Sequence, residues 1–105
     1  MSETSNRVRV CSTEDVMPGE GHYVEVDELE LAVFNVADKY FVTDNQCTHG
    51  PGSLSEGFLD GTVIECDFHG GAFDVCTGEV VAAPCMVPLK TYTVTLEGND
   101  IMIDV

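Results

Sequence analysis

Two short stretches of this sequence each place one cysteine close to one histidine. The first reads CTHG, with one residue between Cys47 and His49, and the second reads CDFHG, with two residues between Cys66 and His69. Sixteen residues separate His49 from Cys66, so two loops can bring these four side chains to one site. Thiolate and imidazole together suit zinc, copper or an iron–sulfur centre. The pattern therefore predicts a metal centre that takes one cysteine and one histidine from each loop.

Three interpretations of these four residues are open. In the first, the cysteines are small buried hydrophobic residues and the histidines are ordinary polar residues. In the second, they hold a structural zinc ion, although zinc fingers usually pair cysteine with cysteine and histidine with histidine. In the third, two cysteines bind one iron and two histidines bind the other iron of a [2Fe–2S] centre. The glycines that follow both pairs favour the third, because they let backbone N–H groups approach an inorganic sulfide closely.

The elements around these motifs are predicted to be strands. Short runs of β-branched and aromatic residues recur between turn signals, which is typical of a small antiparallel β-sandwich or barrel. The best helix candidate is the short stretch STEDVM, with Ser12 as its N-cap. EGN at 97–99 is expected to close a hairpin, and Ala37-Asp38 a tight turn. The expected strands are 7–11, 22–26, 29–36, 39–43, 61–66, 72–75, 91–96 and 100–105.

Composition and charge restrict the function. The chain has 105 residues, 44% of them hydrophobic, so we expect one domain with a core of its own. Nineteen acidic residues against four basic ones give a net charge of −15, which argues against nucleic acid and anionic membranes as partners. No apolar run approaches a membrane span, and the N-terminal residues lack an apolar signal-peptide core. We therefore expect a cytoplasmic protein.

CTHG, the sixteen-residue gap and CDFHG match the Rieske signature C-x-H…C-x-x-H. The following stretch, GGAFDVCTGEVVAAP…VPLKTY, also resembles soluble Rieske-type ferredoxins, the ferredoxin components of bacterial aromatic-ring-hydroxylating dioxygenase systems. The resemblance implies one [2Fe–2S] cluster, with Cys47 and Cys66 on the buried iron and His49 and His69 on the iron nearer solvent.

The resemblance also implies an organisation of the chain. It predicts a single Rieske domain (1–105), in which 1–44 and 89–105 form the β framework and about 45–88 forms a loop-built cluster-binding subdomain. A third loop, around Ala83-Pro84 and Pro88, would cover the cluster, although a simple turn before the strand at Thr91 is the alternative. Cys11, Cys76 and Cys85 lie outside the motif and are expected to be structural thiols.

This sequence differs from respiratory Rieske proteins in four positions that the resemblance makes comparable. Gly52 and Phe68 stand where those proteins have the cysteines of a disulfide, so that bridge cannot form. Gly71 and Phe73 stand where they have a serine and a tyrosine whose hydroxyls bind the cluster sulfurs. Hydrogen bonds to the sulfurs raise the potential, so we expect a value near the lower end of the Rieske range of about −150 to +300 mV.

The expected function is electron transfer without catalysis. Only His22 remains outside the motif, so the mononuclear iron site of an oxygenase, with two histidines and a carboxylate, cannot be built. No G-x-G-x-x-G unit for NAD or flavin is present. The resemblance implies a one-electron carrier between a flavoprotein reductase and a terminal oxygenase. We expect its contacts with them to be transient, and we expect a monomer, the default for a shuttle. A permanently bound subunit of another oxidoreductase, a zinc-stabilised interaction module and a redox sensor are the alternatives.

Overall fold

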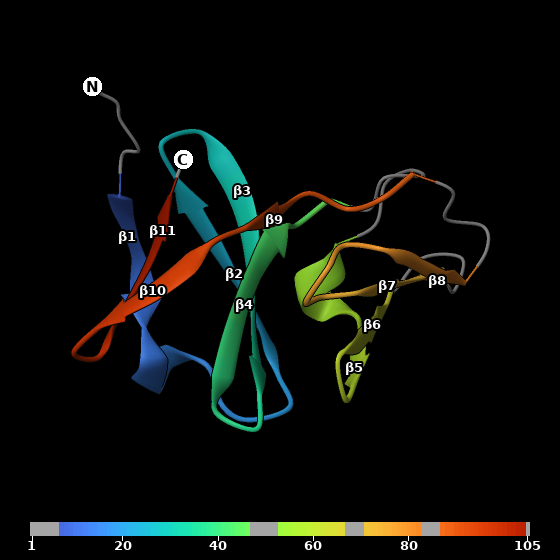
Figure 1. The fold of residues 1–105 in the computed structure, drawn as a ribbon, viewed down its shortest axis with the longest axis horizontal. Coiled ribbons are helices and arrows are strands. Elements are labelled where there is room, and N and C mark those ends of the chain that lie inside the picture. The colour runs from blue at the N-terminus through green and yellow to red at the C-terminus, as the bar shows by residue number, and fades with distance from the viewer. Residues whose placement is uncertain (1–6, 47–52, 67–70, 83–86, 105) are drawn as a thin grey trace.

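The computed structural model describes residues 7–46, 53–66, 71–82 and 87–104, and these form three antiparallel β-sheets (Figure 1). The all-β prediction is confirmed. The first sheet has the order β1-β11-β10, from strands Arg7–Ser12, Asp100–Asp104 and Val94–Glu97. The second has the order β2-β3-β4-β9, from Gly21–Val26, Leu29–Val36, Lys39–Asp44 and Thr91–Tyr92. The third has the order β5-β6-β7-β8, from Phe58–Asp60, Val63–Glu65, Ala72–Asp74 and Val80–Ala82.

Tight turns account for the regular pairing of β2, β3 and β4. Asp27 and Glu28 between β2 and β3, and Ala37 and Asp38 between β3 and β4, all have positive φ. Two successive residues with positive φ define the turn whose twist matches that of a two-stranded ribbon. Asn35 supports the second turn, because its Oδ1 accepts a hydrogen bond of 2.8 Å from the Asp38 N–H. The predicted tight turn is therefore confirmed.

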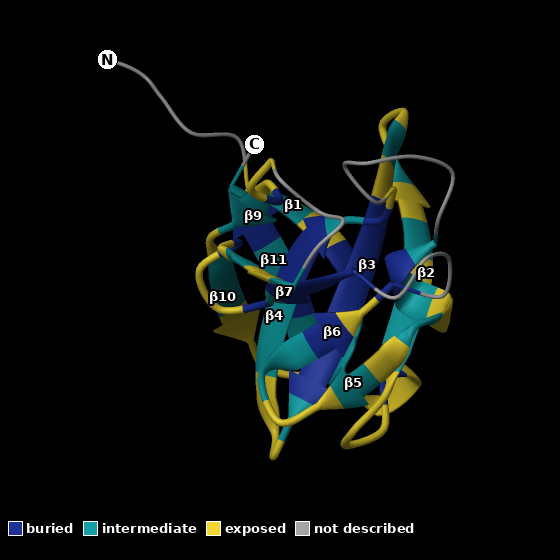
Figure 2. Ribbon diagram, turned by 90° about the vertical axis from the view of Figure 1, so that its right-hand side faces the viewer, coloured by how far each residue is buried: buried dark blue, intermediate teal, exposed yellow. Residues whose placement is uncertain are grey.

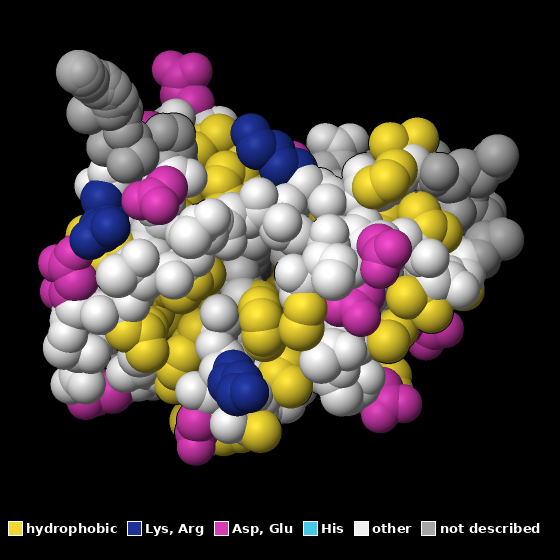
Figure 3. Space-filling view, in the orientation of Figure 1, with side chains coloured by type: hydrophobic (Ala, Val, Ile, Leu, Met, Phe, Trp, Pro, Cys, Tyr) yellow, Lys and Arg dark blue, Asp and Glu magenta, His cyan; other side chains and the backbone are white. Residues whose placement is uncertain are grey.

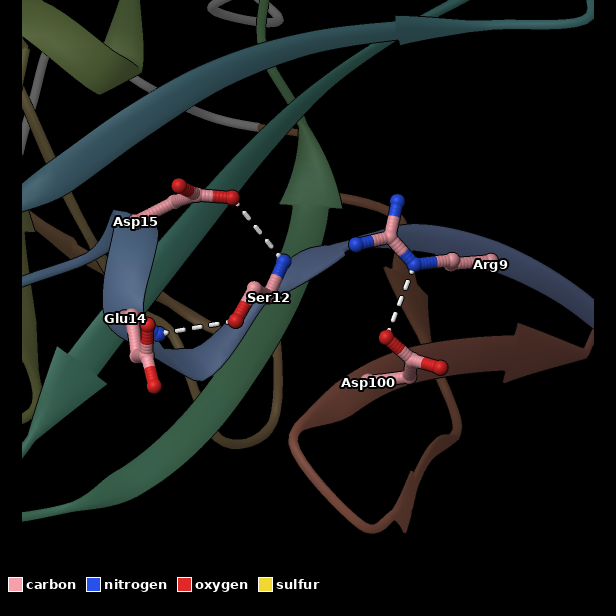
Figure 4. A network of polar contacts seen from close by, with 5 residues as sticks. All are labelled: Arg9, Ser12, Glu14, Asp15 and Asp100. Atoms are coloured by element: carbon pink, nitrogen blue, oxygen red, sulfur yellow. Dashed lines mark hydrogen bonds and ion pairs between the residues drawn. The ribbon is translucent and has the colours of Figure 1, made fainter.

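The only helical elements among the described residues are two short 3-10 turns, η1 (Thr13–Asp15) and η2 (Leu54–Glu56). Ser12 caps η1 as predicted: its hydroxyl accepts from the Glu14 N–H at 3.2 Å, and its own N–H donates to Asp15 at 3.0 Å (Figure 4). Next to this cap, Arg9 and Asp100 form an ion pair of 2.8 Å that joins β1 to β11. No helix in the described part of the chain is long and apolar enough to cross a membrane.

The C-terminal strands differ from the prediction in one respect. Residues 91–96 were expected to form one strand, but β9 pairs with β4 whereas β10 pairs with β11. The chain thus changes sheets at Thr93, which lies between β9 and β10. The expected hairpin between β10 and β11 is confirmed, with Gly98 at φ 63° in its turn.

Two buried clusters fill the interior. One joins the first two sheets and consists of Val10, Cys11, Val16, Leu31, Val33, Val42, Ile101 and Ile103. The other, called here the site-side core, joins the opposite face of β3 to η2, β6 and β7, and consists of Ala32, Phe34, Leu54, Ile64, Cys66, Phe73, Val75 and Leu89. Strand β3 therefore contributes alternate residues to both clusters, as the period of a strand requires.

The middle of the chain contains more regular structure than its composition indicated. Segment 45–88 was expected to be built of loops around the two strands 61–66 and 72–75, but it carries the four strands of the third sheet and η2. This sheet lies to one side of the other two in Figure 1 and faces the viewer in Figure 2. Its strands have only three residues each, so turns and connecting segments make up much of this part of the chain.

Candidate metal centre

Cys66 is the one predicted ligand among the described residues, and it lies directly after strand β6. Its side chain belongs to the site-side core, and the residue is only 3% exposed. Its N–H donates a hydrogen bond of 2.6 Å to the carbonyl of Gly71. Cys66 and Gly71, the residues on either side of segment 67–70, therefore lie next to each other. Cys47, His49 and His69 lie outside the described residues.

The first motif is flanked by an equally close pair of residues. Gln46 and Ser53 form an isolated antiparallel bridge. Asn45, which precedes them and is 7% exposed, donates from Nδ2 to the Ser53 hydroxyl at 3.0 Å. Its Oδ1 accepts from the Ser55 N–H at 2.9 Å, and its carbonyl accepts from the Leu54 N–H at 2.8 Å. Asn45 thus holds together the two ends of segment 47–52.

Both motifs start from the same region of the fold. Leu54, just after the first motif, and Cys66, at the start of the second, are members of the site-side core together with Phe73. The Asn45 N–H also donates to the carbonyl of Glu30 at 2.9 Å, which anchors the first loop to β3. The described neighbours of the two motifs therefore converge, as a shared site requires.

The region of the expected third loop is fixed in the same way at both ends. Ala82, before segment 83–86, pairs with Ala72 next to Gly71. After that segment, the Leu89 N–H donates to the carbonyl of Gly78 at 2.8 Å, and Leu89 is buried in the site-side core. Gly78 has φ +82°, and a Cβ there would collide with the Leu89 carbonyl. Ala83 and Pro84 lie outside the described residues.

The surroundings of the site are compatible with a [2Fe–2S] cluster. The described ranges contain no group of three or more potential metal ligands. This is expected, because three of the four predicted ligands lie outside these ranges. Segment 45–88 contains six acidic residues and no lysine or arginine. Two ferric ions, two sulfides and two thiolates are neutral in sum, so such a group can be placed against an apolar core without a basic counter-ion.

The other cysteines and the third histidine take different positions. Cys11 is buried in the cluster that joins the first two sheets, where burial raises the pKa of its thiol to about 11. Cys76 is exposed in the turn after β7, so this thiol is not a core residue, contrary to the expectation of a packed structural thiol. His22 lies in β2, as an ordinary strand residue. Cys85 lies outside the described residues.

Sequence reasoning missed Asn45 as a residue of the site. The signal available was its position two residues before Cys47 and two residues after the end of the predicted strand 39–43. Its buried amide, with bonds to Ser53 and Ser55, becomes visible only in three dimensions. Asparagine is common in turns, where it bonds to nearby backbone groups, so type alone did not distinguish it.

Comparison with known proteins identifies the class. Residues 6–93 match the Rieske [2Fe-2S] domain family. The chain is 47% identical over 97 residues to the biphenyl dioxygenase ferredoxin subunit of Pseudomonas sp. strain KKS102, covering 91% of this chain and 89% of that protein. The chain belongs to the Rieske [2Fe-2S] domain family, and its prosthetic group is one Rieske-type [2Fe–2S] cluster.

Two solved structures match the fold along nearly the whole chain. The Sphingomonas yanoikuyae B1 ferredoxin superposes with a TM-score of 0.91 and 48% identity, covering 95% of this chain and 99% of that one. The ferredoxin in a complex of reduced oxygenase and oxidised ferredoxin of carbazole 1,9a-dioxygenase superposes with a TM-score of 0.86 and 45% identity, covering 93% and 92%. The fold of this chain is thus that of these ferredoxins.

Proposed function

We infer that this chain is the ferredoxin component of a multicomponent aromatic-ring dioxygenase system. It carries single electrons from a flavin-dependent NAD(P)H reductase to the terminal oxygenase and catalyses no reaction alone. The observation that carries this inference is near-full-length identity of 47% to a dioxygenase ferredoxin subunit, together with the two Cys/His motifs at Rieske spacing. The relative seen in complex with an oxygenase supports the choice of electron acceptor.

The proposed ligands of the cluster are Cys47, His49, Cys66 and His69. Bound there, a Rieske [2Fe–2S] cluster supplies a reversible one-electron couple. The residues of the chain provide its setting: the site-side core keeps water from the Cys66 side, and the Asn45 network fixes the ends of the first loop. The third sheet with η2 and the three loop segments constitutes the cluster-binding subdomain, and the remaining strands constitute the framework.

The partners bind transiently, and the protein acts as a cytoplasmic monomer. A carrier must leave one partner before it meets the next, so its interfaces are expected at the small end of the range, below about 1,200 Å². The acidic surface accelerates encounters with basic partner surfaces, and this effect is screened by salt. Net charge of −15 makes such steering strong at low ionic strength.

Reconstitution with both partner enzymes tests this function. Stopped-flow absorbance follows reduction of the purified holo-protein by NAD(P)H and reductase, and then its reoxidation by the oxygenase. Both steps are expected, with rates that fall as salt is raised. Failure of the oxygenase to reoxidise the reduced protein, or a complex that stays intact through gel filtration at micromolar concentration, would contradict a mobile carrier.

A further inference from the structure

The outer face of the third sheet carries an unusual combination of side chains. Phe58 pairs with Glu65 across β5 and β6, and Glu65 pairs with Ala72 across β6 and β7, so these three form one row. Asp60 pairs with Val63 in the neighbouring row on the same face. A hollow of about 200 Å³ is lined by these five residues, and Figure 2 looks onto this side of the molecule.

The two faces of this sheet differ in what they contact. Ile64 and Phe73 on the inner face are fully buried in the site-side core, with Leu59 packed against them. On the outer face Phe58 is 66% exposed, although it is a large aromatic residue. The inner apolar residues thus contribute to the core, whereas the Phe58 ring is open to solvent beside the hollow and available for contact with a partner.

The hollow is lined by two acidic residues, so its negative charge favours a cationic side chain as occupant. Asp60 and Glu65 stand at its rim, and the ion pairs seen among the described residues involve Arg7 and Arg9 on the framework instead. Lys90 lies over the Tyr92 ring, also in the framework. In Figure 3 the lysine and arginine side chains in view lie over the framework strands, whereas acidic and hydrophobic side chains cover the third sheet.

The hollow lies on the outer face of the sheet at the end of β6 that leads into the proposed ligand Cys66, whose side chain belongs to the site-side core on the inner face. Glu65 directly precedes Cys66, and Phe58 on the neighbouring strand pairs with Glu65. Neighbouring strands are separated by about 4.8 Å, so a protein seated on Phe58 comes close to the strand end that carries Cys66. A short distance between the redox centres of two partners favours electron transfer, so a docking site at this position would serve the exchange of electrons.

We propose that the hollow formed by Phe58, Asp60, Val63, Glu65 and Ala72 is a docking site for the terminal oxygenase and receives an arginine or lysine side chain from it. The apolar stem of that side chain packs on Phe58 and Val63, and its charged head pairs with Asp60 and Glu65. This inference rests on the proposed function, which supplies the oxygenase as electron acceptor. The charge complementarity and the oxygenase complex of a 45% identical ferredoxin select this occupant.

Binding measurements on matched variants test the proposal. Phe58→Ala removes the aromatic anchor, and Leu96→Ala is its control, because Leu96 is also exposed, at 49%, but lies on β10 of the framework. The variant Asp60→Asn with Glu65→Gln removes two charges. Its control changes Glu25 and Glu30, two exposed residues paired across β2 and β3, to glutamine. Visible spectra and midpoint potentials establish that each variant holds an unaltered cluster.

The dissociation constant for the purified oxygenase is expected to rise about tenfold in Phe58→Ala and to change less than about twofold in Leu96→Ala. The double charge variant is expected to lower the association rate and its salt dependence more than its control. Equal effects of Phe58→Ala and Leu96→Ala would overturn the proposal. Weakened binding of the reductase with unchanged binding of the oxygenase would also overturn it. Failure of the wild type to pass electrons to the oxygenase would instead count against the proposed function.

Discussion

Substitution of Asn45 by alanine is expected to loosen the first motif and to release the cluster. The change removes the hydrogen bonds to Ser53 at 3.0 Å and from the Ser55 N–H at 2.9 Å. Each such bond contributes about 0.5–1.5 kcal/mol, and a buried N–H left without a partner costs about 1–3 kcal/mol more. Asn45 is only 7% exposed, so water can replace only part of the lost hydrogen bonding. We therefore expect a loss of about 2–3 kcal/mol in the free energy of unfolding.

Asn35 offers a matched control at the other end of the β3–β4 hairpin. It is 1% exposed, donates from Nδ2 to the carbonyl of Val16 at 2.9 Å and accepts from the Asp38 N–H at 2.8 Å. Asn35→Ala therefore removes the same number of short bonds from a buried asparagine. We expect a similar loss of stability, but no effect on the site, because Asn35 supports only the framework.

Two measurements separate local from global effects of these variants. Urea unfolding followed by circular dichroism gives the stability of each, and the decay of visible absorbance in the presence of a chelator gives the rate of cluster loss under native conditions. Cluster loss is expected to be at least about fivefold faster in Asn45→Ala than in Asn35→Ala, which corresponds to about 1 kcal/mol of local opening. Equal rates in two equally destabilised variants would refute the role of Asn45 at the first motif.

Three further predictions concern the fold, its pH dependence and the potential. Gly78→Ala should lower stability by about 2–4 kcal/mol in urea unfolding, because its Cβ meets the Leu89 carbonyl, whereas Gly98→Ala, with nothing within 4 Å, should cost about 1 kcal/mol; equal losses would contradict this. Burial raises the pKa of Cys11 from 9.0 to about 11, so the unfolded chain loses that proton first and stability should fall between these pH values. This loss of stability, roughly 1–2 kcal/mol after solvent screening, should be absent in Cys11→Ala. If the free energies of unfolding of the two proteins differ by a constant amount across this pH range, Cys11 is not the group responsible. The midpoint potential should lie near the lower end of about −150 to +300 mV, since Phe73 offers no hydroxyl; voltammetry giving a value near the upper end would contradict this.

The framework was predictable because its strands carry strong local signals. Strand β3 alternates into two cores, and its turn at Ala37-Asp38 has the short spacing of a hairpin. The division of residues 91–96 was not predictable, since β9 and β10 form a continuous β-branched pattern and differ only in their partners. A change of sheet depends on distant residues, which a local pattern does not contain.

The four ligands stay a prediction from the sequence, because only Cys66 lies among the described residues, and the residues that support the site were not predicted. The spacing of the two Cys/His pairs identifies the chemistry, because each residue type is required by the metal. Strands β5 and β8 escaped prediction because, unlike the equally short β6 and β7, they contain no fully buried residue. The Asn45 network escaped for a similar reason, since its partners Ser53 and Ser55 lie beyond the first motif and meet it only after folding.

The most direct test of the central claim is a visible and EPR spectrum of the purified protein, oxidised and then reduced with dithionite, with iron and acid-labile sulfide measured on the same sample. A red-brown protein with two irons and two sulfides per chain is expected. Its reduced EPR signal should have a mean g value below that of ferredoxins whose clusters have cysteine ligands alone. A colourless, EPR-silent protein with one tightly bound zinc ion would contradict the account.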